Sequence, residues 1–397
     1  ESVSRFQPAL GRKLDLYRLF ASLSFSIARQ TGRVGLIVPM SLLGDQQTAN
    51  LREFVLEKAT PLVIDAFPQK DDPTRRVFYE AKLPTCVVVM QKGLEDDYKA
   101  RLRVHPGKVL DEVSGEAYVS KSQLEDCQRL LGSIPLVSSV SEMELALRLH
   151  KLPCFGRLGD EVQTYQGEIN ATTHRDYLSK DPGVGPRVYR GGNVQRYEFI
   201  EEAKQGDVLH IDVKAFARKH QGGKFEHTSL QRFGYQRKAA LDNWRRLIFC
   251  ELPSPPCYCI ESISYYLSEG AKSRLMLALL NSQLFEWRFE LTSTNNMVST
   301  DEIASLPFRR ILFTTPEESR KRKLTSLLAA YQRGQMDVVL NQVGQLLPKD
   351  AQGGFIAFEG NATGDEENSD VVHDLLAHLA ERMIAMHKEK QEQQRAF

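Results

Sequence analysis

The chain has 397 residues, and single hydrophobic cores rarely reach that length, so we expect two or three domains. Charged residues make up 26% of the chain and hydrophobic residues 42%, which is ordinary for a soluble globular protein. The formal net charge of +1 excludes a chain that is basic over its whole surface, so any surface that binds a polyanion must be local.

The first predicted elements are a helix and a buried strand. Residues 14–29 carry apolar side chains at the i, i+3, i+4 spacing of a helix that packs one face on a core. The side chains expected to face that core are Leu16, Leu19, Phe20, Leu23 and Ile27. Residues 34–38 then form a short apolar run closed by Pro39, which is typical of a strand buried on both faces.

A second helix and two further strands follow. The pattern predicts a helix over 46–58, with Leu51, Phe54 and Val55 directed inward, and a strand over 61–67. A third strand is expected over 83–90, after a polar loop. This order indicates an α/β layer architecture, and the third strand together with the segment near 100–104 suggests an antiparallel edge. We interpret the region as one side of a doubly wound sheet that lacks its first strands.

The texture of the sequence changes after about residue 150. Residues 152–310 alternate short apolar runs with Gly, Pro and Asn clusters, which predicts many short strands. One strong helix is expected over 270–290, with Leu275, Leu284 and Trp287 on its core-facing stripe. Beyond residue 316 the chain is predicted to be mainly helical, with helices over 316–331 and 370–394.

The six cysteines show no CxxC pair and no zinc-type spacing with histidine. Cys257 and Cys259 could chelate a metal, but alternation along a strand explains their spacing better. Free thiols fit a reducing cytoplasm, where we expect the protein to act. The cysteine spacing therefore leads us to predict no metal site. No apolar run approaches the roughly 18–20 residues of a membrane span, so we predict no membrane partner.

Three stretches of the first 92 residues resemble one enzyme family when their order and spacing are taken together. They are 14–20 (LDLYRLF), 32–39 (GRVGLIVP) and 77–92 (VFYEAKLPTCVVVMQK). Together they resemble the downstream half of the catalytic domain in γ-class N6-adenine DNA methyltransferases of restriction–modification systems, of the type IIG kind. The chain begins without an initiator Met, so we expect Glu1 to mark a boundary inside a longer protein.

Four later stretches resemble the TaqI-like specificity domain that such enzymes carry. They are 165–173, 188–197, 279–284 and 295–307. The resemblance implies the C-terminal part of a Rossmann-like methyltransferase sheet, followed by a mixed α+β target-recognition domain and a helical tail. The implied boundaries are 1–95 for the catalytic part, 96–150 for a connecting segment, 151–312 for target recognition and 313–397 for a helical extension.

The chain departs from that family at two motifs. The family's Gly-containing loop for S-adenosylmethionine is not in this sequence, and neither is its Asn-Pro-Pro-aromatic element. We therefore assign no catalytic residue, and we expect S-adenosylmethionine to serve the parent enzyme without binding to this chain alone. The resemblance implies double-stranded DNA and a missing N-terminal catalytic region, or a separate catalytic or nuclease subunit, as partners. The alternatives are a non-catalytic specificity subunit that pairs with another chain, and an α/β protein whose basic stretch is incidental.

Methylation of a base inside a duplex requires the base to be extruded and held by stacking. The family places a stacking Phe at the start of the third matched strand, which corresponds to Phe78. Phe67 is a competing choice, and Phe78 could instead anchor a loop to the core.

Residues 187–246 hold thirteen Lys and Arg against seven Asp and Glu, with aromatic residues between them. This local positive charge is typical of a surface that follows phosphates, although it could also be an ordinary solvated face. Around the Gly191-Gly192 turn we select Arg190, Asn193 and Arg196 as candidates to read base edges. The candidates for contacts with the DNA backbone are Lys219, Lys224, Arg232, Arg237 and Lys238. The pair Asn295 and Asn296 could also face DNA, but Asn in loops more often caps turns.

Overall fold

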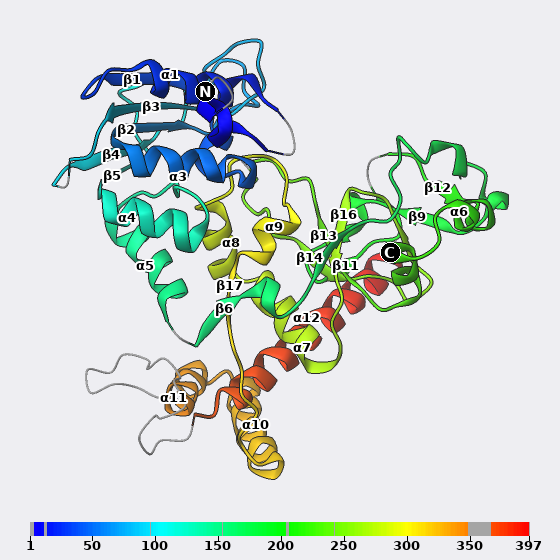
Figure 1. Cartoon of the computed structure of the whole chain (residues 1–397). Coiled ribbons are helices and arrows are strands. Elements are labelled where there is room, and N and C mark those ends of the chain that lie inside the picture. The colour runs from blue at the N-terminus through cyan, green and yellow to red at the C-terminus, as the bar shows by residue number, and fades with distance from the viewer. Residues whose placement is uncertain are drawn as a thin grey trace. The chain divides into compact units, whose positions relative to one another are not determined.

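The computed structural model describes residues 4–11, 14–95, 97–152, 154–203, 206–241, 243–347 and 367–396. The chain divides into two compact units (Figure 1). Unit 1 comprises Glu1–Lys151, Ala239–Trp244 and Trp287–Met297, and unit 2 comprises Leu152–Lys238, Arg245–Glu286 and Val298–Phe397. The predicted α/β class, with several sheets and a helical C-terminal tail, is confirmed.

Unit 1 is built on a five-stranded sheet with the order β1-β3-β2-β4-β5. The strands are β1 (Arg33–Pro39), β2 (Ala59–Phe67), β3 (Thr85–Lys92), β4 (Lys99–Val104) and β5 (Gly115–Ser120). The expected antiparallel strand, β3, lies between β1 and β2 and not at an edge. Because no helix separates β2 from β3, the two strands pair directly, while β2 and β4 run parallel. The sheet therefore extends past residue 95, into the segment expected to be a connector.

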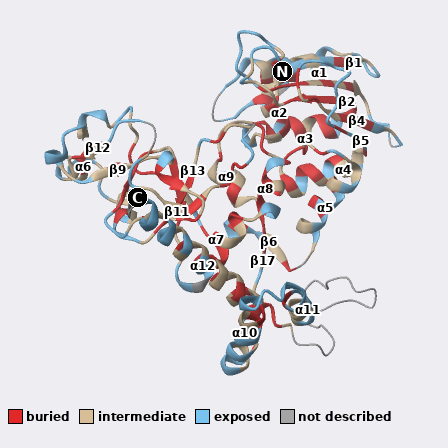
Figure 2. Cartoon of the chain, turned by 180° about the vertical axis from the view of Figure 1, so that it is seen from behind, coloured by how far each residue is buried: buried red, intermediate tan, exposed pale blue. Residues whose placement is uncertain are grey.

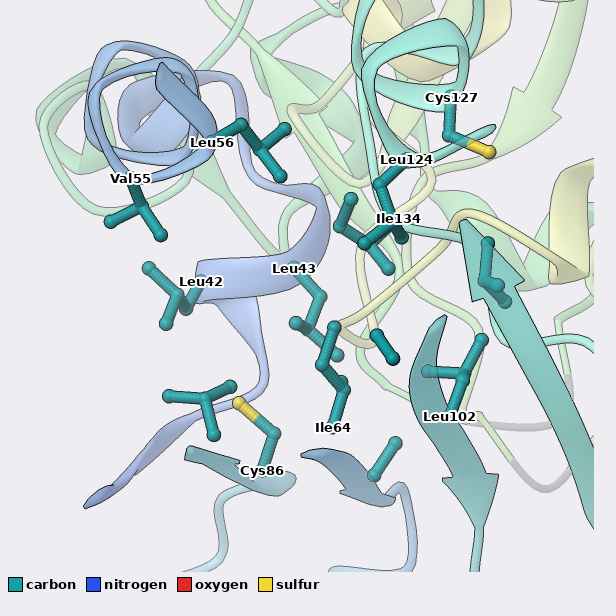
Figure 3. Close-up of a cluster of buried hydrophobic side chains, with 14 of the residues drawn as sticks. Leu42, Leu43, Val55, Leu56, Ile64, Cys86, Leu102, Leu124, Cys127 and Ile134 are labelled. Atoms are coloured by element: carbon teal, nitrogen blue, oxygen red, sulfur yellow. The ribbon is translucent and has the colours of Figure 1, made fainter. Parts of the chain in front are cut away.

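The helices of unit 1 enclose an apolar core. They are η1 (Ser4–Ala9), α1 (Leu16–Ile27), α2 (Ser41–Gly44), η2 (Gln46–Thr48), α3 (Ala49–Lys58), α4 (Lys121–Asp126), η3 (Cys127–Leu131) and α5 (Val140–Lys151). Figure 3 shows Leu43 of α2 and Ile64 of β2 in this core, with Leu124 and Ile134 next to Leu43. Leu51 and Val55 are buried as predicted, and Phe54 packs against the core from a partly exposed position.

The predicted inward face of α1 is wrong. Leu16 is 71% exposed, Phe20 61% and Ile27 73%, whereas Phe25 and even Arg18 are buried. Arg18 can be buried because its guanidinium donates to the carbonyl of Gln47 at 2.8 Å and to the carboxylate of Asp15 at 3.3 Å.

Strand β1 is also not buried on both faces. Its burial alternates, with Val34 and Val38 inside and Ile37 50% exposed. Such alternation is typical of a strand in an antiparallel pairing, with one face on a core and the other toward solvent.

Unit 2 contains the predicted short strands. Two four-stranded sheets have the orders β15-β9-β12-β8 and β14-β13-β16-β7, and β10-β11 and β17-β6 form two-stranded pairs. The bounds are β6 (Phe155–Arg157), β7 (Thr164–Gln166), β8 (Leu178–Ser179), β9 (Arg187–Tyr189), β10 (Val194–Gln195), β11 (Glu198–Phe199), β12 (Leu209–Ile211), β13 (Phe233–Gln236), β14 (Phe249–Glu251), β15 (Tyr258–Cys259), β16 (Ile263–Tyr266) and β17 (Pro307–Arg309). Separate apolar clusters lie under the two larger sheets.

The helix predicted over 270–290 is two helices, α7 (Gly270–Leu280) and α8 (Gln283–Glu290). The break lies at Asn281, whose buried side chain accepts from the backbone N–H of Phe249 at 3.1 Å and donates to its C=O at 3.0 Å. These bonds tie the helix break to β14. Leu284, which was predicted to be core, is half-exposed in the second helix.

The other helical segments of unit 2 are shorter, apart from those of the C-terminal tail. They are η4 (Leu158–Asp160), η5 (Arg175–Tyr177), η6 (Pro182–Val184), η7 (Gly191–Asn193), α6 (Val213–Lys219), η8 (Gly223–Ser229), α9 (Thr300–Ala304), α10 (Glu317–Gln332), α11 (Met336–Leu346) and α12 (Ser369–Ala396). The tail helix α12 packs on α7 and α10 of the same chain. In Figure 2 exposed residues of unit 2 are seen around α6 and on α10, among other places. Within the described ranges, no helix is both long and apolar enough to cross a membrane.

Candidate nucleic-acid interface

The loop that joins β2 to β3 presents two exposed aromatic side chains. Phe78 is 46% exposed and Tyr79 is 70% exposed. The loop backbone is nevertheless fixed by the buried side chain of Arg76, which donates to the carbonyls of Lys70 and Tyr79. Because Phe78 reaches solvent, it does not act mainly as a core anchor, and its predicted role as a stacking residue remains open to test.

The competing candidate, Phe67, lies in the interior. Its ring is 3% exposed and stacks on the imidazole of His105, with the ring centroids 4.5 Å apart and the planes at 9°. A ring covered in this way has no face left for a nucleobase.

A buried polar cluster next to Phe67 was not found from the sequence. The carboxylate of Asp65 accepts from Arg103 at 2.7 and 3.0 Å and lies 3.2 Å from Nε2 of His105. Burial alone raises the pKa of Asp65, but the hydrogen bonds and charges of Arg103 and His105 outweigh it and lower that pKa. An acidic residue inside an otherwise apolar strand was the one signal available.

The same cluster fixes the loop between β4 and β5. Nδ1 of His105 lies 2.9 Å from the carbonyl of Glu112, and Arg75 donates to the carbonyl of Pro106 at 2.7 Å. Because Arg75 belongs to the loop that carries Tyr79, the two loops are tied to each other. These hydrogen bonds hold the backbone of the two loops in place. The carboxylate of Asp65 is already bonded to Arg103 and His105.

Two of the predicted DNA contacts in unit 2 are interior residues. Arg232 is 1% exposed, and its guanidinium pairs with the carboxylate of Glu168 at 2.9 Å. Asn193 is 2% exposed; its side-chain oxygen accepts from the N–H of Arg190, and its amide donates to the carbonyls of Ile200 and Glu201. The predicted contacts of Arg232 with phosphate and of Asn193 with a base are therefore wrong, because these groups are already occupied inside the protein.

Arg190 and Arg196 are half-buried and also bound to backbone. Arg190 donates to the carbonyl of Asp207 at 2.7 Å, and Arg196 donates to that of Asn281 at 2.9 Å. The backbone at Gly191 lies close to that of Ser262: a Cβ at Gly191 would lie 2.8 Å from the carbonyl oxygen of Ser262. Glycine at that position is thus explained by packing. Base reading by Arg190 or Arg196 would require these bonds to be exchanged.

Of the five exposed basic side chains that the structure describes between residues 187 and 246, four lie on α6 and just after it. The sequence-predicted Lys219 and Lys224 are exposed there, and so are Lys214 and Arg218, which the sequence analysis did not single out. Asp212 caps α6 by accepting from the N–H of Ala215 at 2.9 Å. We call Lys214, Arg218, Lys219 and Lys224 the α6 basic surface.

Two further predicted contacts, Lys238 and Arg237, directly follow β13. Lys238 is exposed and Arg237 is half-buried.

In unit 1, the side-chain oxygen of Asn295 caps a turn by accepting from the N–H of Met297, whereas that of Asn296 accepts from the N–H of Leu241, which is distant in sequence. Asn295 thus has the turn-capping role, and Asn296 instead joins two segments that are distant in sequence.

The cysteines and a core cavity are two features that bear on metal and ligand binding. The cysteines are free and buried, and no group of three or more His, Cys, Asp or Glu among the described residues could hold a metal ion. A cavity of about 50 Å³ lies in the core of unit 1, lined by aliphatic side chains and Arg52. It is far smaller than the roughly 300–1,000 Å³ of pockets that take drug-sized ligands.

No family model and no curated protein matches the chain. Among solved structures, the type IIG restriction endonuclease BpuSI aligns with 95% of this chain and 51% of its own, at 12% identity and a TM-score of 0.31. The type IIL restriction–modification enzyme MmeI, in complex with DNA, aligns with 94% of this chain and 49% of its own, at 11% identity and a TM-score of 0.46. A nuclease-deletion mutant of the type ISP enzyme LlaGI aligns with 94% of this chain and 47% of its own, at 8% identity and a TM-score of 0.36. This chain thus spans about half the length of these proteins.

Proposed function

We propose that the chain is the DNA-binding, target-recognition portion of a site-specific N6-adenine DNA methyltransferase from a restriction–modification system, inactive without its catalytic partner. The observation that carries the proposal is the α6 basic surface. Four exposed cations there lie within eleven residues, in a chain whose total charge is +1. Such a local concentration of Lys and Arg favours binding to phosphates. The adenine target and the restriction–modification setting come from the sequence resemblance.

The catalytic partner would join unit 1 at β1. This strand is at the edge of the sheet and pairs with β3 alone among the described strands. The exposed side chains of Leu16, Phe20 and Ile27 on α1 and of Ile37 on β1 provide apolar area in the same unit. An unpaired edge strand with exposed apolar residues is a template for pairing with another segment. The partner would supply the S-adenosylmethionine loop and the Asn-Pro-Pro-aromatic element, and we assign no residue of this chain to the cofactor.

The alternative is a non-catalytic specificity subunit that pairs with a separate catalytic chain, since the same edge could receive that chain. The gene upstream of Glu1 discriminates between the two. A donor-binding loop and an Asn-Pro-Pro-aromatic element in the same reading frame would favour a single enzyme. Their location in another gene would favour the subunit.

The proposal is tested by duplex binding across a series of salt concentrations. We expect salt-dependent binding by the chain, and we expect Lys219→Ala with Lys224→Ala to weaken it several-fold while reducing the salt dependence. Arg322→Ala, at an exposed position on α10, is the control and should bind as wild type. The chain alone should transfer no methyl group from S-adenosylmethionine. Absence of binding at low salt would remove DNA recognition from the account.

A further inference from the structure

Tyr79 is more exposed than any other tyrosine among the described residues. Its side chain is 70% exposed, compared with 53% for Tyr118 and 40% for Tyr331. Other tyrosines among the described residues are buried in the core, as Tyr235 and Tyr265 are. Exposure of a large ring leaves apolar area in water, so its position next to Phe78 requires an explanation.

The ring is presented by a fixed backbone. Arg76, 7% exposed, donates to the carbonyls of Lys70 and Tyr79 and so closes the loop on itself. Asp72 caps the preceding turn by accepting from the N–H and the hydroxyl of Thr74, at 2.8 and 2.7 Å. A ring on a preorganised loop loses little conformational entropy when it binds a ligand.

The ring of Tyr79 is in contact with Arg76, and most of its remaining surface is exposed. The guanidinium carbon of Arg76 lies 5.8 Å from the centroid of the Tyr79 ring, which is within range of a cation–π contact. With 70% of the side chain still exposed, a flat ligand can reach the ring. Nucleobases are flat, and their stacking on aromatic side chains tolerates every base because each has a π-face.

We propose that Tyr79 is a stacking site for an unpaired nucleobase, held by Arg76 and additional to the stacking role predicted for Phe78. This inference rests on the proposed function, because it takes DNA as the ligand. Both the extruded base and a base left unpaired by extrusion have the required chemistry.

The test compares a duplex that carries one bulged 2-aminopurine with a fully paired duplex of the same sequence, using the whole chain. We expect tighter binding of the bulged duplex, with quenched 2-aminopurine fluorescence. Tyr79→Ala should reduce that preference by roughly 5- to 150-fold, the range for loss of one base–aromatic stack. Tyr79→Phe should retain it, whereas Tyr79→Leu should lose it although its side chain is still apolar. Tyr118→Ala, at an exposed tyrosine on β5 of the same unit, is the matched control and should leave the preference unchanged.

The outcomes separate this inference from the proposed function. Binding of paired duplex with no preference for the bulge, or a preference that survives in Tyr79→Ala, overturns the Tyr79 site and leaves DNA recognition standing. Retention of the preference in Tyr79→Leu also overturns it, because apolar contact would then suffice. If wild type binds neither duplex at low salt, the proposed function and the Tyr79 site both fall. A 2-aminopurine placed next to the bulge is the positional control: its fluorescence should not change, and quenching of that paired neighbour alone would also overturn the Tyr79 site.

Discussion

Glu168→Gln is expected to destabilise unit 2 strongly, because it leaves the buried cation of Arg232 without a counter-charge. The side chain of Arg232 is 0% exposed and that of Glu168 is 2% exposed, and their charged groups are 2.9 Å apart. Glu168 also accepts from the N–H of Cys259 at 2.8 Å, and the guanidinium lies 4.6 Å from the ring centroid of Tyr265. Removing one partner of such a pair costs about 3–5 kcal/mol. Since domains are stable by only about 5–15 kcal/mol, this is a large fraction of the total.

The free energy of unfolding is measured by urea titration followed by far-UV circular dichroism, and hydrogen exchange at β13 and β16 locates the loss in unit 2. Glu251→Gln is the control, because the ion pair of Glu251 with Arg274 is about a quarter exposed and should contribute less than about 1 kcal/mol. The double variant Glu168→Met with Arg232→Met should recover much of the stability, since no unpaired charge remains. A loss below about 1 kcal/mol in Glu168→Gln would refute the reasoning that the buried charge of Arg232 depends on Glu168.

Two further predictions concern the core of unit 1. The pKa of Asp65 is lowered in the folded state, so its stabilising effect is complete above its unfolded pKa of about 3.9 and is lost as the pH falls through the lower folded value. Asp65→Asn should therefore reduce stability at neutral pH and flatten the decline in acid, as urea titrations between pH 2 and 6 would report; an unchanged acid limb would contradict this. Val88→Ile adds one methyl group beside the cavity of about 50 Å³ and should raise the free energy of unfolding by about 0.5–1 kcal/mol. A lower urea midpoint would instead indicate overpacking.

The types of most elements in unit 1 could be predicted because apolar runs and helical spacing report burial directly. Helix α3 and strand β2 follow their patterns. The inward face of α1 could not be predicted, because the helix has apolar residues on both sides. Ala21 and Phe25 pack inward, whereas Phe20 remains exposed. Periodicity cannot choose between two apolar faces; the choice depends on which face other parts of the chain cover.

The order of the sheet was also beyond the sequence pattern. A strand that follows another without a helix must run back antiparallel, and the sequence predicts that much. Whether β3 pairs outside β2 or between β2 and β1 depends on long-range pairing with Val34–Val38 of β1. Local spacing contains no information about that pairing.

The candidate site was overestimated because charge was counted without its partners. Arg232 is neutralised by Glu168, 64 residues away in sequence, and Arg245 lies 3.6 Å from the carboxylate of Glu286. Both arginines are buried, as is Arg246. A local window counts such cations as surface charge, because the carboxylates that bury them come from distant parts of the chain.

This redistribution of charge changes the expected strength of the salt dependence. Of the thirteen basic residues between 187 and 246, Lys204 lies outside the described residues, and five of the others are exposed: Lys214, Arg218, Lys219, Lys224 and Lys238. Each phosphate neutralised contributes about −0.9 to the slope of log K against log salt. If the five exposed cations make the contacts, the slope should be about −4 to −5, and Lys219→Ala should make it shallower by about 1. A slope near −12 would require the buried arginines to reach phosphates as well, and a slope near zero would mean that the α6 basic surface does not bind DNA.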